Sequence, residues 1–349
     1  MIIKVQSKAV RIWLFFGLIM VAVQIFLGGI TRLTGSGLSI TKWEIVTGSI
    51  IPLTEDAWNE SFNLYKETPQ YKKINNGISI SEFKYIYWWE YLHRLWARIM
   101  GFVFIFPFFL FIRKGILHRW LVKDLLFIVF LAVIVASLGW IMVASGLINR
   151  PWVNAYKLSF HLCAASILVG YLLWTNLKAV YGFSYDQYKR NYSIYYGLIP
   201  ILFFLQIFLG GLMSGMKAAL VAPTWPDING VIIPGEVRAI SDFTSFIFRD
   251  YESNPGSSII VQFFHRSFAY SILFFVGCVI CIQKLKKGTV DINILWLFLF
   301  TLLQGVIGIL TLVYSQGSVP LWFGVLHQML GIFCFCFSIF SWYTVRFRE

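Results

Sequence analysis

Long apolar runs dominate the chain, and short polar stretches separate them. About 17–25 apolar residues are enough to cross a bilayer as a helix. Eight such runs can be read near residues 12–30, 92–112, 125–147, 156–177, 194–213, 259–282, 292–314 and 321–343. A membrane barrel would instead show alternating segments of about ten residues, a pattern that the sequence lacks. The pattern predicts an all-α polytopic membrane protein with eight transmembrane helices.

Composition and charge agree with a membrane protein and set its orientation. Of the 349 residues 58% are hydrophobic and 13% are charged, against about 25% charged in soluble domains. Five short segments, 1–11, 113–124, 178–193, 283–291 and 346–349, contain 15 of the 29 Lys and Arg. Positive loops face the cytoplasm, which predicts that both termini lie inside. The net charge of +13 therefore reflects orientation, and nucleic acid is not expected as a partner. No presequence is visible, which favours a bacterial inner membrane.

The chain contains an internal repeat. Residues 23–52 and 205–234 are identical at twelve of thirty positions, including QIFLGG and the IIP at the end of each segment. Further on, His93-Arg94 is matched by His265-Arg266, and His161 is matched by His327. The sequence therefore predicts two parallel four-helix units, residues 1–180 and 181–349. The first unit includes a long outer loop over residues 31–87.

Four of the five histidines occur near the starts of the even-numbered helices. His93, His161, His265 and His327 are expected within about two turns of their helix starts, at a common depth below the outer surface. Ionisable side chains within a membrane are usually paired or functional. His118, in a basic inner loop, is expected to be solvated.

A haem suits these histidines better than zinc does. Structural zinc sites gather four ligands, commonly with thiolates, and no cysteine or acid recurs with the histidines. A haem iron takes one imidazole from each side, so we expect His93 to pair with His161 and His265 with His327. Pairing between the halves is the alternative. Arg94 and Arg266 could bind haem propionates, or could simply extend to the membrane interface.

The two predicted sites differ in one ionisable residue. Glu90 lies three residues before His93, on the same helical face, whereas Gln262 holds that place before His265. A carboxylate beside a bound haem could act as a general base or proton relay. The alternative is an interfacial acid paired with Arg94. The difference predicts one site for chemistry and one for electrons.

The five cysteines lie within predicted helices, at 163, 278, 281, 334 and 336. None is in an outer loop, so no loop disulfide is expected. Cys278 and Cys281 form a CVIC that superficially resembles a redox pair, and packing is the simpler interpretation in an apolar helix.

Taken together, these motifs resemble those of the haem A synthases. The likeness is carried by GGITRLTGSGLSITKWEIVTGSIIP at 28–52, EFKYIYWWEYLHRLWARIMGF at 82–102, and His161, His265 and His327. It covers nearly the whole chain and is closest to the branch with a long first outer loop, which includes the mitochondrial enzymes. The E-x-x-H motif followed by three further helix-head histidines is quite specific.

The resemblance implies an eight-helix oxidoreductase acting on a methyl group. Such an enzyme oxidises the C8 methyl of haem O to a formyl group through a gem-diol, giving haem A for terminal oxidases. On this view His93 and His161 hold the substrate haem, Glu90 assists proton removal, and His265 and His327 hold a permanent haem b. Haem O synthase and an electron donor are implied partners, and a homo-oligomer is possible.

Some members of that family carry a cysteine pair in the first outer loop, and this chain has no cysteine there. A thiol-based step is therefore not expected. We expect the long loop to form short amphipathic helices over the outer haem sites. A plain solvent-exposed linker is the alternative.

Two other classes of protein fit part of the pattern. A di-haem cytochrome b that passes electrons from quinol to a partner explains the four histidines equally well. It does not explain the difference between Glu90 and Gln262, or the likeness in the first loop. A transporter built from two repeats would place its polar groups near the bilayer midplane, whereas here they cluster toward one side.

Overall fold

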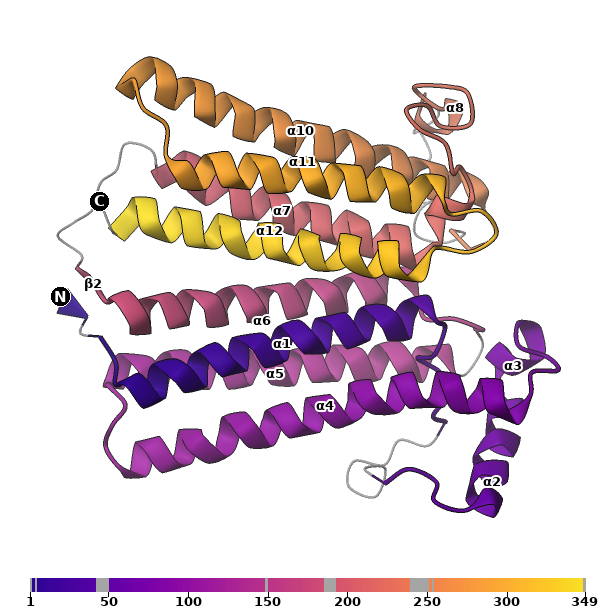
Figure 1. Cartoon of the computed structure of the whole chain (residues 1–349). Coiled ribbons are helices and arrows are strands. Elements are labelled where there is room, and N and C mark those ends of the chain that lie inside the picture. The colour runs from indigo at the N-terminus through magenta and orange to yellow at the C-terminus, as the bar shows by residue number, and fades with distance from the viewer. Residues whose placement is uncertain are drawn as a thin grey trace.

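The computed structural model describes residues 2–3, 5–41, 50–147, 150–184, 193–238, 251–252 and 254–347. Within these ranges, eight helices are long and apolar enough to cross a membrane. They are α1 (Lys8–Leu33), α4 (Ile80–Arg113), α5 (Arg119–Gly146), α6 (Ala155–Tyr181), α7 (Ser193–Gly215), α10 (Pro255–Lys287), α11 (Ile292–Val313) and α12 (Leu321–Phe347). Each coincides with one apolar run of the sequence, so the all-α fold with eight spans is confirmed (Figure 1).

Two of these helices begin earlier than their apolar runs indicate. α4 begins at Ile80, and α10 begins at Pro255. The Ser79 side chain accepts the Glu82 backbone N–H while the Glu82 carboxylate accepts the Ser79 N–H, a capping box that starts α4 in polar sequence. Pro255 stands in the first turn of α10, where it costs no hydrogen bond. Local capping, and not hydrophobicity, therefore sets both starts.

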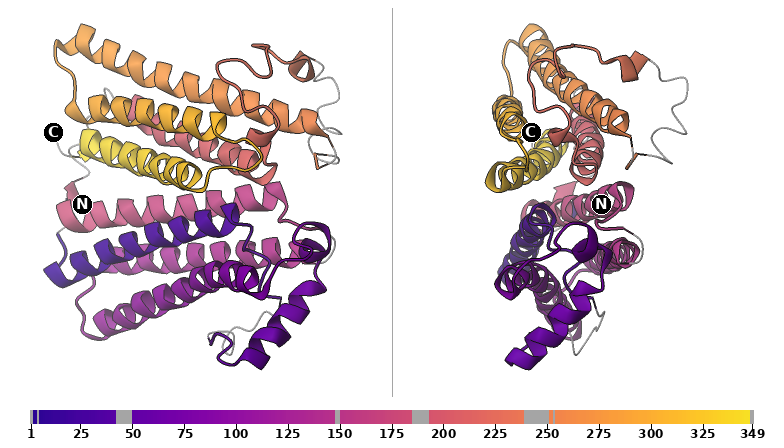
Figure 2. Two further views of the ribbon diagram at one scale, coloured as in Figure 1. Left: turned by 45° about the vertical axis from the view of Figure 1, so that its right-hand side comes forward. Right: turned by 90° about the vertical axis from the view of Figure 1, so that its right-hand side faces the viewer.

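The long helices form two groups side by side. In the end-on view, α1, α4, α5 and α6 lie together, and α7, α10, α11 and α12 form the other group (Figure 2). Within the groups, α1 contacts α4 and α7 contacts α10, while α5 contacts α6 and α11 contacts α12. Between them, α6 packs on α7 and α1 packs on α12. These are the pairs that a parallel repeat would relate, and the division near residue 180 stays a prediction.

Small residues bring the two groups into close contact. A Cβ on Gly215 of α7 would lie 2.5 Å from the Cα of Ala155 in α6. One turn away, a Cβ on Gly211 would lie 2.7 Å from the Cα of Ser159. Small residues allow such close approach of helix backbones inside membranes. The Ser159 hydroxyl also donates to the Phe208 carbonyl across this seam, at 2.6 Å.

Short elements connect the long helices at the end where α1 finishes. They are α2 (Glu55–Lys66), α3 (Pro69–Lys73), the 3-10 turn η3 (Ala218–Leu220) and α8 (Gly235–Arg238). α2 and α3 lie in the long first loop, so the predicted short helices there are confirmed (Figure 1). The repeated Trp43 and Gly48 lie outside the described residues.

An aromatic cluster fixes α2 to the first turns of α4. Trp58, Phe62 and Tyr65 recur along one face of α2 and pack against Phe83 and Tyr87. Such spacing gives one apolar stripe on a helix that is otherwise polar. Burial raises the pKa of Tyr65 to about 12, so its hydroxyl stays protonated as a hydrogen-bond donor. This cluster turns the long loop into a packed cap.

The described residues also include a minimal sheet, which the sequence did not predict. Strand β1 (Ile2–Ile3) pairs antiparallel with β2 (Phe183–Ser184). Nearby, the Gln6 N–H donates to the Ala179 carbonyl at 2.9 Å. These bonds tie the N-terminus to the end of α6, where the two groups of helices are joined.

Candidate functional site

His265 of α10 and His327 of α12 face each other across the second group. Their ring centroids are 6.3 Å apart, and the ring planes are inclined by 72°. A metal–imidazole bond is about 2 Å long, so two imidazoles on opposite sides of one iron have ring centres roughly 6 Å apart. The separation of this pair thus fits two axial ligands of a single metal.

His93 of α4 and His161 of α6 form the corresponding pair in the first group. The two imidazoles lie within electrostatic range of each other. All four side chains are half-buried. The structure thus places two of the histidines in each group, and their pairing as haem ligands stays a prediction.

The depth of the histidines along their helices differs from the expectation. His161 and His327 lie within two turns of the starts of α6 and α12. His93 and His265 lie further along, because α4 and α10 begin in the polar sequence ahead of the apolar runs. The prediction of two turns was therefore wrong for these two. His118 is exposed at the start of α5, as predicted.

No group of three or more His, Cys, Asp or Glu able to hold a metal ion occurs among the described residues. A haem requires only two protein ligands, because its four pyrrole nitrogens supply the others. The paired histidines therefore meet the ligand requirement of a haem with nothing further.

The Glu90 side chain is buried and fully engaged by its neighbours. Its Oε2 accepts the backbone N–H groups of Ser39 and Ile40 at 2.7 and 2.9 Å, and the Ser39 hydroxyl at 2.7 Å. Its Oε1 accepts Arg94 Nη2 at 2.5 Å in an i,i+4 ion pair. Glu90 thus holds the first loop against α4, one turn from His93.

The second group repeats this arrangement with the opposite hydrogen-bonding polarity. Gln262 is fully buried, and its Nε2 donates to the Ala222 carbonyl at 2.8 Å. Ala222 occupies the position in the repeat that Ile40 occupies in the first half. The Glu90 carboxylate accepts hydrogen bonds from the first loop. The Gln262 amide instead donates a hydrogen bond to the second loop.

Arg94 and Arg266 both reach the loop that lies over their histidine. Besides Glu90, Arg94 Nη2 contacts the Ile40 carbonyl at 3.4 Å. Arg266 donates from Nη1 to the carbonyls of Thr224 and Asp227 at 3.2 and 3.0 Å, and from Nη2 to that of Pro226. Both guanidinium groups are therefore fixed at the histidine-bearing end of the helices.

Comparison with known proteins identifies the family. Residues 11–339 match the cytochrome oxidase assembly protein family COX15-CtaA. The chain belongs to this family. It is 39% identical over 331 residues to the "Heme A synthase" of Methylorubrum populi, covering 93% of this chain and 83% of that protein. It is 37% identical to that of Parvibaculum lavamentivorans, over 99% and 96% of the two chains, and 37% identical to that of Flavobacterium johnsoniae, over 95% and 96%. The resemblance noted in the sequence is confirmed.

Three glutamines of this COX15-CtaA member touch the histidines and were not assigned from the sequence. Gln24, Gln206 and Gln304 donate from Nε2 to the backbone carbonyls of the residues at 93, 265 and 327. The first two open the repeated QIFLGG motif. The repetition of Gln24 and Gln206 could have indicated a role beside the histidines, but a repeated motif by itself indicates only a duplication.

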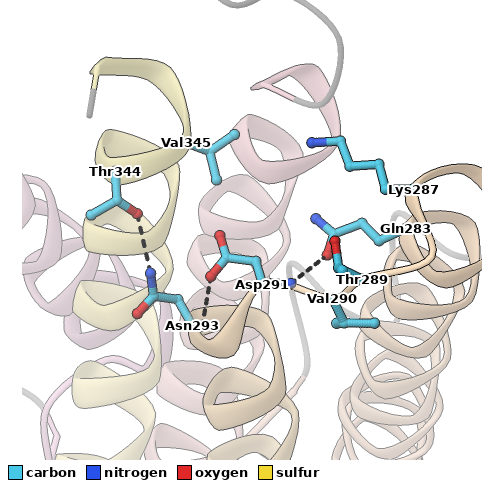
Figure 3. Close-up of a pocket in the computed structure, with 8 residues that line it drawn as sticks. All are labelled: Gln283, Lys287, Thr289, Val290, Asp291, Asn293, Thr344 and Val345. Atoms are coloured by element: carbon cyan, nitrogen blue, oxygen red, sulfur yellow. Dashed lines mark hydrogen bonds between the residues drawn. The ribbon is translucent and has the colours of Figure 1, made fainter. Parts of the chain in front are cut away.

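A polar cavity of about 430 Å³ lies at the other end of the second group. Gln283, Asp291, Asn293 and Thr344 line it, together with the last turn of α10 (Figure 3). Gln283 Oε1 accepts the Asp291 N–H at 3.0 Å, and Asn293 Nδ2 donates to the Thr344 hydroxyl at 3.4 Å. These polar groups bond mainly to one another, far from the histidines.

The five cysteines of this family member are all free thiols. Cys278 is half-buried and Cys281 is exposed on α10. They lie beyond His265 toward the opposite end of the helix, so nothing connects the CVIC motif with the histidine pairs.

Proposed function

We propose that the chain is a haem A synthase. As an oxidoreductase it converts the C8 methyl group of haem O into a formyl group and so supplies haem A to terminal cytochrome oxidases. The observation that carries the proposal is the likeness to proteins named "Heme A synthase" over 93–99% of the chain. The paired histidines would supply the haem ligands that such a function requires.

We assign different haems to the two pairs. His265 and His327 would hold a resident haem b, supported by ring centres 6.3 Å apart, and this haem would supply one-electron transfer. His93 and His161 would hold substrate haem O and release haem A. The assignment of the substrate to the first pair is supported by the carboxylate of Glu90, which occurs only on that side.

We propose Glu90 as the group that accepts a proton during the oxidation. Four hydrogen bonds to its carboxylate hold that group in one position on the first half's side of the molecule. The loop residues Ser39 and Ile40 fix its position one turn from His93. Gln262 cannot take this role in the second half, because an amide does not exchange a proton in this way.

Arg94 and Arg266 are proposed to interact with haem propionates. A guanidinium has five N–H donors in a planar fork suited to carboxylates. Arg266 donates three bonds to the carbonyls of loop 224–227. A propionate reaching this end of the helix would meet a side chain already fixed in place, which lowers the entropy lost on binding.

The protein is proposed to lie in a bacterial inner membrane with both termini in the cytoplasm. The basic segments gather at the ends of the helices away from the histidines, and positive loops stay inside. The histidine pairs and the cap formed by α2 and α3 would then face the outer side. Haem O synthase and an electron donor are the expected partners.

Incubation with haem O tests the proposal. Purified protein is supplied with haem O and a reductant in air, and the extracted porphyrins are separated by chromatography. A haem A synthase yields the formyl product. A di-haem electron carrier, which the geometry of His265 and His327 would also suit, returns haem O unchanged and shows only a change of redox state.

A further inference from the structure

Each candidate haem ligand packs against a glycine of a neighbouring helix. A Cβ added to any of the four glycines would first meet the Cε1 atom of an imidazole. The contacts are Gly28 with His93 at 3.1 Å, Gly139 with His161 at 3.0 Å, Gly210 with His265 at 3.4 Å, and Gly308 with His327 at 2.7 Å. The ring edge that joins the two nitrogens therefore rests on bare helix backbone, and a larger side chain would displace the ring.

A glutamine precedes three of these glycines by four residues. Gln24, Gln206 and Gln304 lie one turn before Gly28, Gly210 and Gly308, which places each pair on one helical face. The glutamine Nε2 atoms donate to the histidine backbone carbonyls at 3.1, 3.0 and 2.9 Å. Each of these three ligands thus has its main chain tied to the neighbouring helix.

The Oε1 atoms of the same three glutamines are buried, and they have no hydrogen-bond partner among the described residues. A buried amide oxygen without a partner is costly. A metal-bound histidine almost always donates its other ring N–H to a nearby acceptor. At Gln24 and Gln206 the amide nitrogen is already 3.2–3.4 Å from both ring nitrogens. Three buried acceptors thus lie near the histidines without a donor among the described residues.

The fourth ligand lacks this glutamine. Val135 stands four residues before Gly139, and it has no amide to offer. Its backbone carbonyl lies 3.0 Å from His161 Nδ1, so the ring is oriented while its main chain is not tied by a glutamine of α5. His161 therefore differs from the other three: the neighbouring helix binds its ring, and no glutamine of that helix binds its main chain.

We propose that the glutamines are positioning residues that make the C-terminal haem site retentive, and that the N-terminal site releases its haem more easily because only one of its two ligands, His93, has such a glutamine. This inference rests on the proposed function, in which one site keeps its haem and the other exchanges substrate for product. Gln206 and Gln304 hold both ligands of the C-terminal site, whereas Gln24 holds only one ligand of the N-terminal site. The missing glutamine occurs at the site that has to release its haem.

The first test replaces Gln304 by the residue found in the other half. Gln304→Val should raise the rate at which resident haem passes to an excess of apomyoglobin about 3–10-fold, the effect of losing one hydrogen bond, here the bond from Gln304 Nε2 to the His327 carbonyl. The midpoint potential of that haem should shift as well. Gln283→Val is the matched control, because it removes a buried glutamine from α10 roughly 27 Å beyond His265. Haem transfer at the wild-type rate in Gln304→Val would overturn the proposal.

The reverse exchange tests the N-terminal site. Val135→Gln should slow the release of haem O from this site, while Val135→Leu, which adds bulk without an amide, should not. An unchanged release rate in Val135→Gln would overturn the role assigned to the missing glutamine. Gly308→Ala, compared with Gly305→Ala, gives a second measure at the C-terminal site. A Cβ at position 305 meets nothing within 4 Å, so only the substitution at 308 should loosen the haem.

His327→Ala separates failure of this inference from failure of the proposed function. If His327→Ala retains a bis-imidazole spectrum, the ligand assignment itself is wrong. If that variant loses its haem while Gln304→Val retains it at the wild-type rate, the ligands stand and only the role of the glutamines is overturned.

Discussion

The two halves of the molecule place different chemistry on corresponding helix positions. In the first half, Glu90 gathers the N–H groups of Ser39 and Ile40 and pairs with Arg94. In the second, Gln262 donates to Ala222, and Arg266 turns to the carbonyls of the loop. The helices and histidines of one half correspond closely to those of the other. The residue three positions before the histidine does not, because Glu90 is charged and Gln262 is neutral. A duplicated scaffold can thus keep paired histidines in both halves and a carboxylate beside them in one.

The loops above the two pairs differ as well. The first loop folds into α2 and α3, and its aromatic cluster packs on α4. Gln70 links this cap to the rest of the site, because its Nε2 donates to the Gly35 carbonyl at 2.8 Å. The second loop contains only η3 and α8 among its described residues. The half with the carboxylate therefore has a packed cap over this end of its helices.

The largest expected effect comes from removing a proposed haem ligand of the second half. His265→Ala should abolish the resident haem, because one imidazole alone leaves an axial position of the iron open. The measurement is the haem-to-protein ratio and the visible spectrum of the purified variant. His118→Ala, which changes an exposed histidine at the start of α5, is the control and should match the wild type. A normal bis-imidazole spectrum in His265→Ala would refute the ligand assignment.

The next effect concerns the carboxylate that distinguishes the first half. Glu90→Gln should bind both haems but oxidise haem O about 10²–10⁴-fold more slowly, the usual contribution of general acid–base catalysis. The rate of haem A formation measures it. Ser39→Ala is the matched control, since it removes one 2.7 Å bond to Glu90 while keeping the carboxylate. If Ser39→Ala slows the reaction as much as Glu90→Gln does, Glu90 is a structural anchor only.

Loss of the cap should have a smaller and more local effect. Trp58→Ala removes a ring that is 8% exposed and should cost about 3–5 kcal/mol of packing free energy. Protease cleavage within residues 50–75 should therefore accelerate, while the haem at His265 and His327 stays bound. Cleavage at the wild-type rate would show that α2 is not held by this cluster.

The smallest effect is expected from pH at the second loop. Hydrogen bonds from the Gly230 N–H and the Thr224 side chain hold the pKa of Asp227 below its ordinary value. A carboxyl group shifted in this direction stabilises the loop above its unfolded pKa of about 3.9, and the contribution is lost as the pH falls through the folded value. Protection of the backbone amides of residues 222–231, measured relative to their intrinsic exchange rates, should therefore fall below about pH 4 in the wild type. Asp227→Asn should abolish that dependence, and an identical pH profile in the variant would contradict the assignment.

The sequence predicted the parts of the structure that depend on local patterns. Apolar runs were sufficient to identify the eight spans, because length and hydropathy decide whether a helix crosses lipid. They misplaced the starts of α4 and α10, since caps at Ser79 and Asn254 lie in polar sequence. The pairing of Ile2–Ile3 with Phe183–Ser184 joins segments too short and too distant to leave a pattern.

The sequence was sufficient to predict which residues form the candidate site. It did not predict which residues they contact. Repetition along the chain indicated the four histidines, Glu90 and Gln262. The partners of Glu90, Ser39 and Ile40, lie some fifty residues earlier in a loop, and loop conformation has no periodic signal. Gln304 was missed because it lies outside the matched QIFLGG segments, although it serves His327 as Gln206 serves His265.

The porphyrin content of two single variants tests most directly whether each half holds its own haem. His161→Ala and His327→Ala are purified after incubation with haem O, and the bound porphyrins are extracted and separated. The account predicts that His161→Ala keeps haem b and lacks haem O and haem A, while His327→Ala lacks haem b and keeps haem O. Loss of the same porphyrin from both variants would contradict it, because the two histidines would then serve a single site.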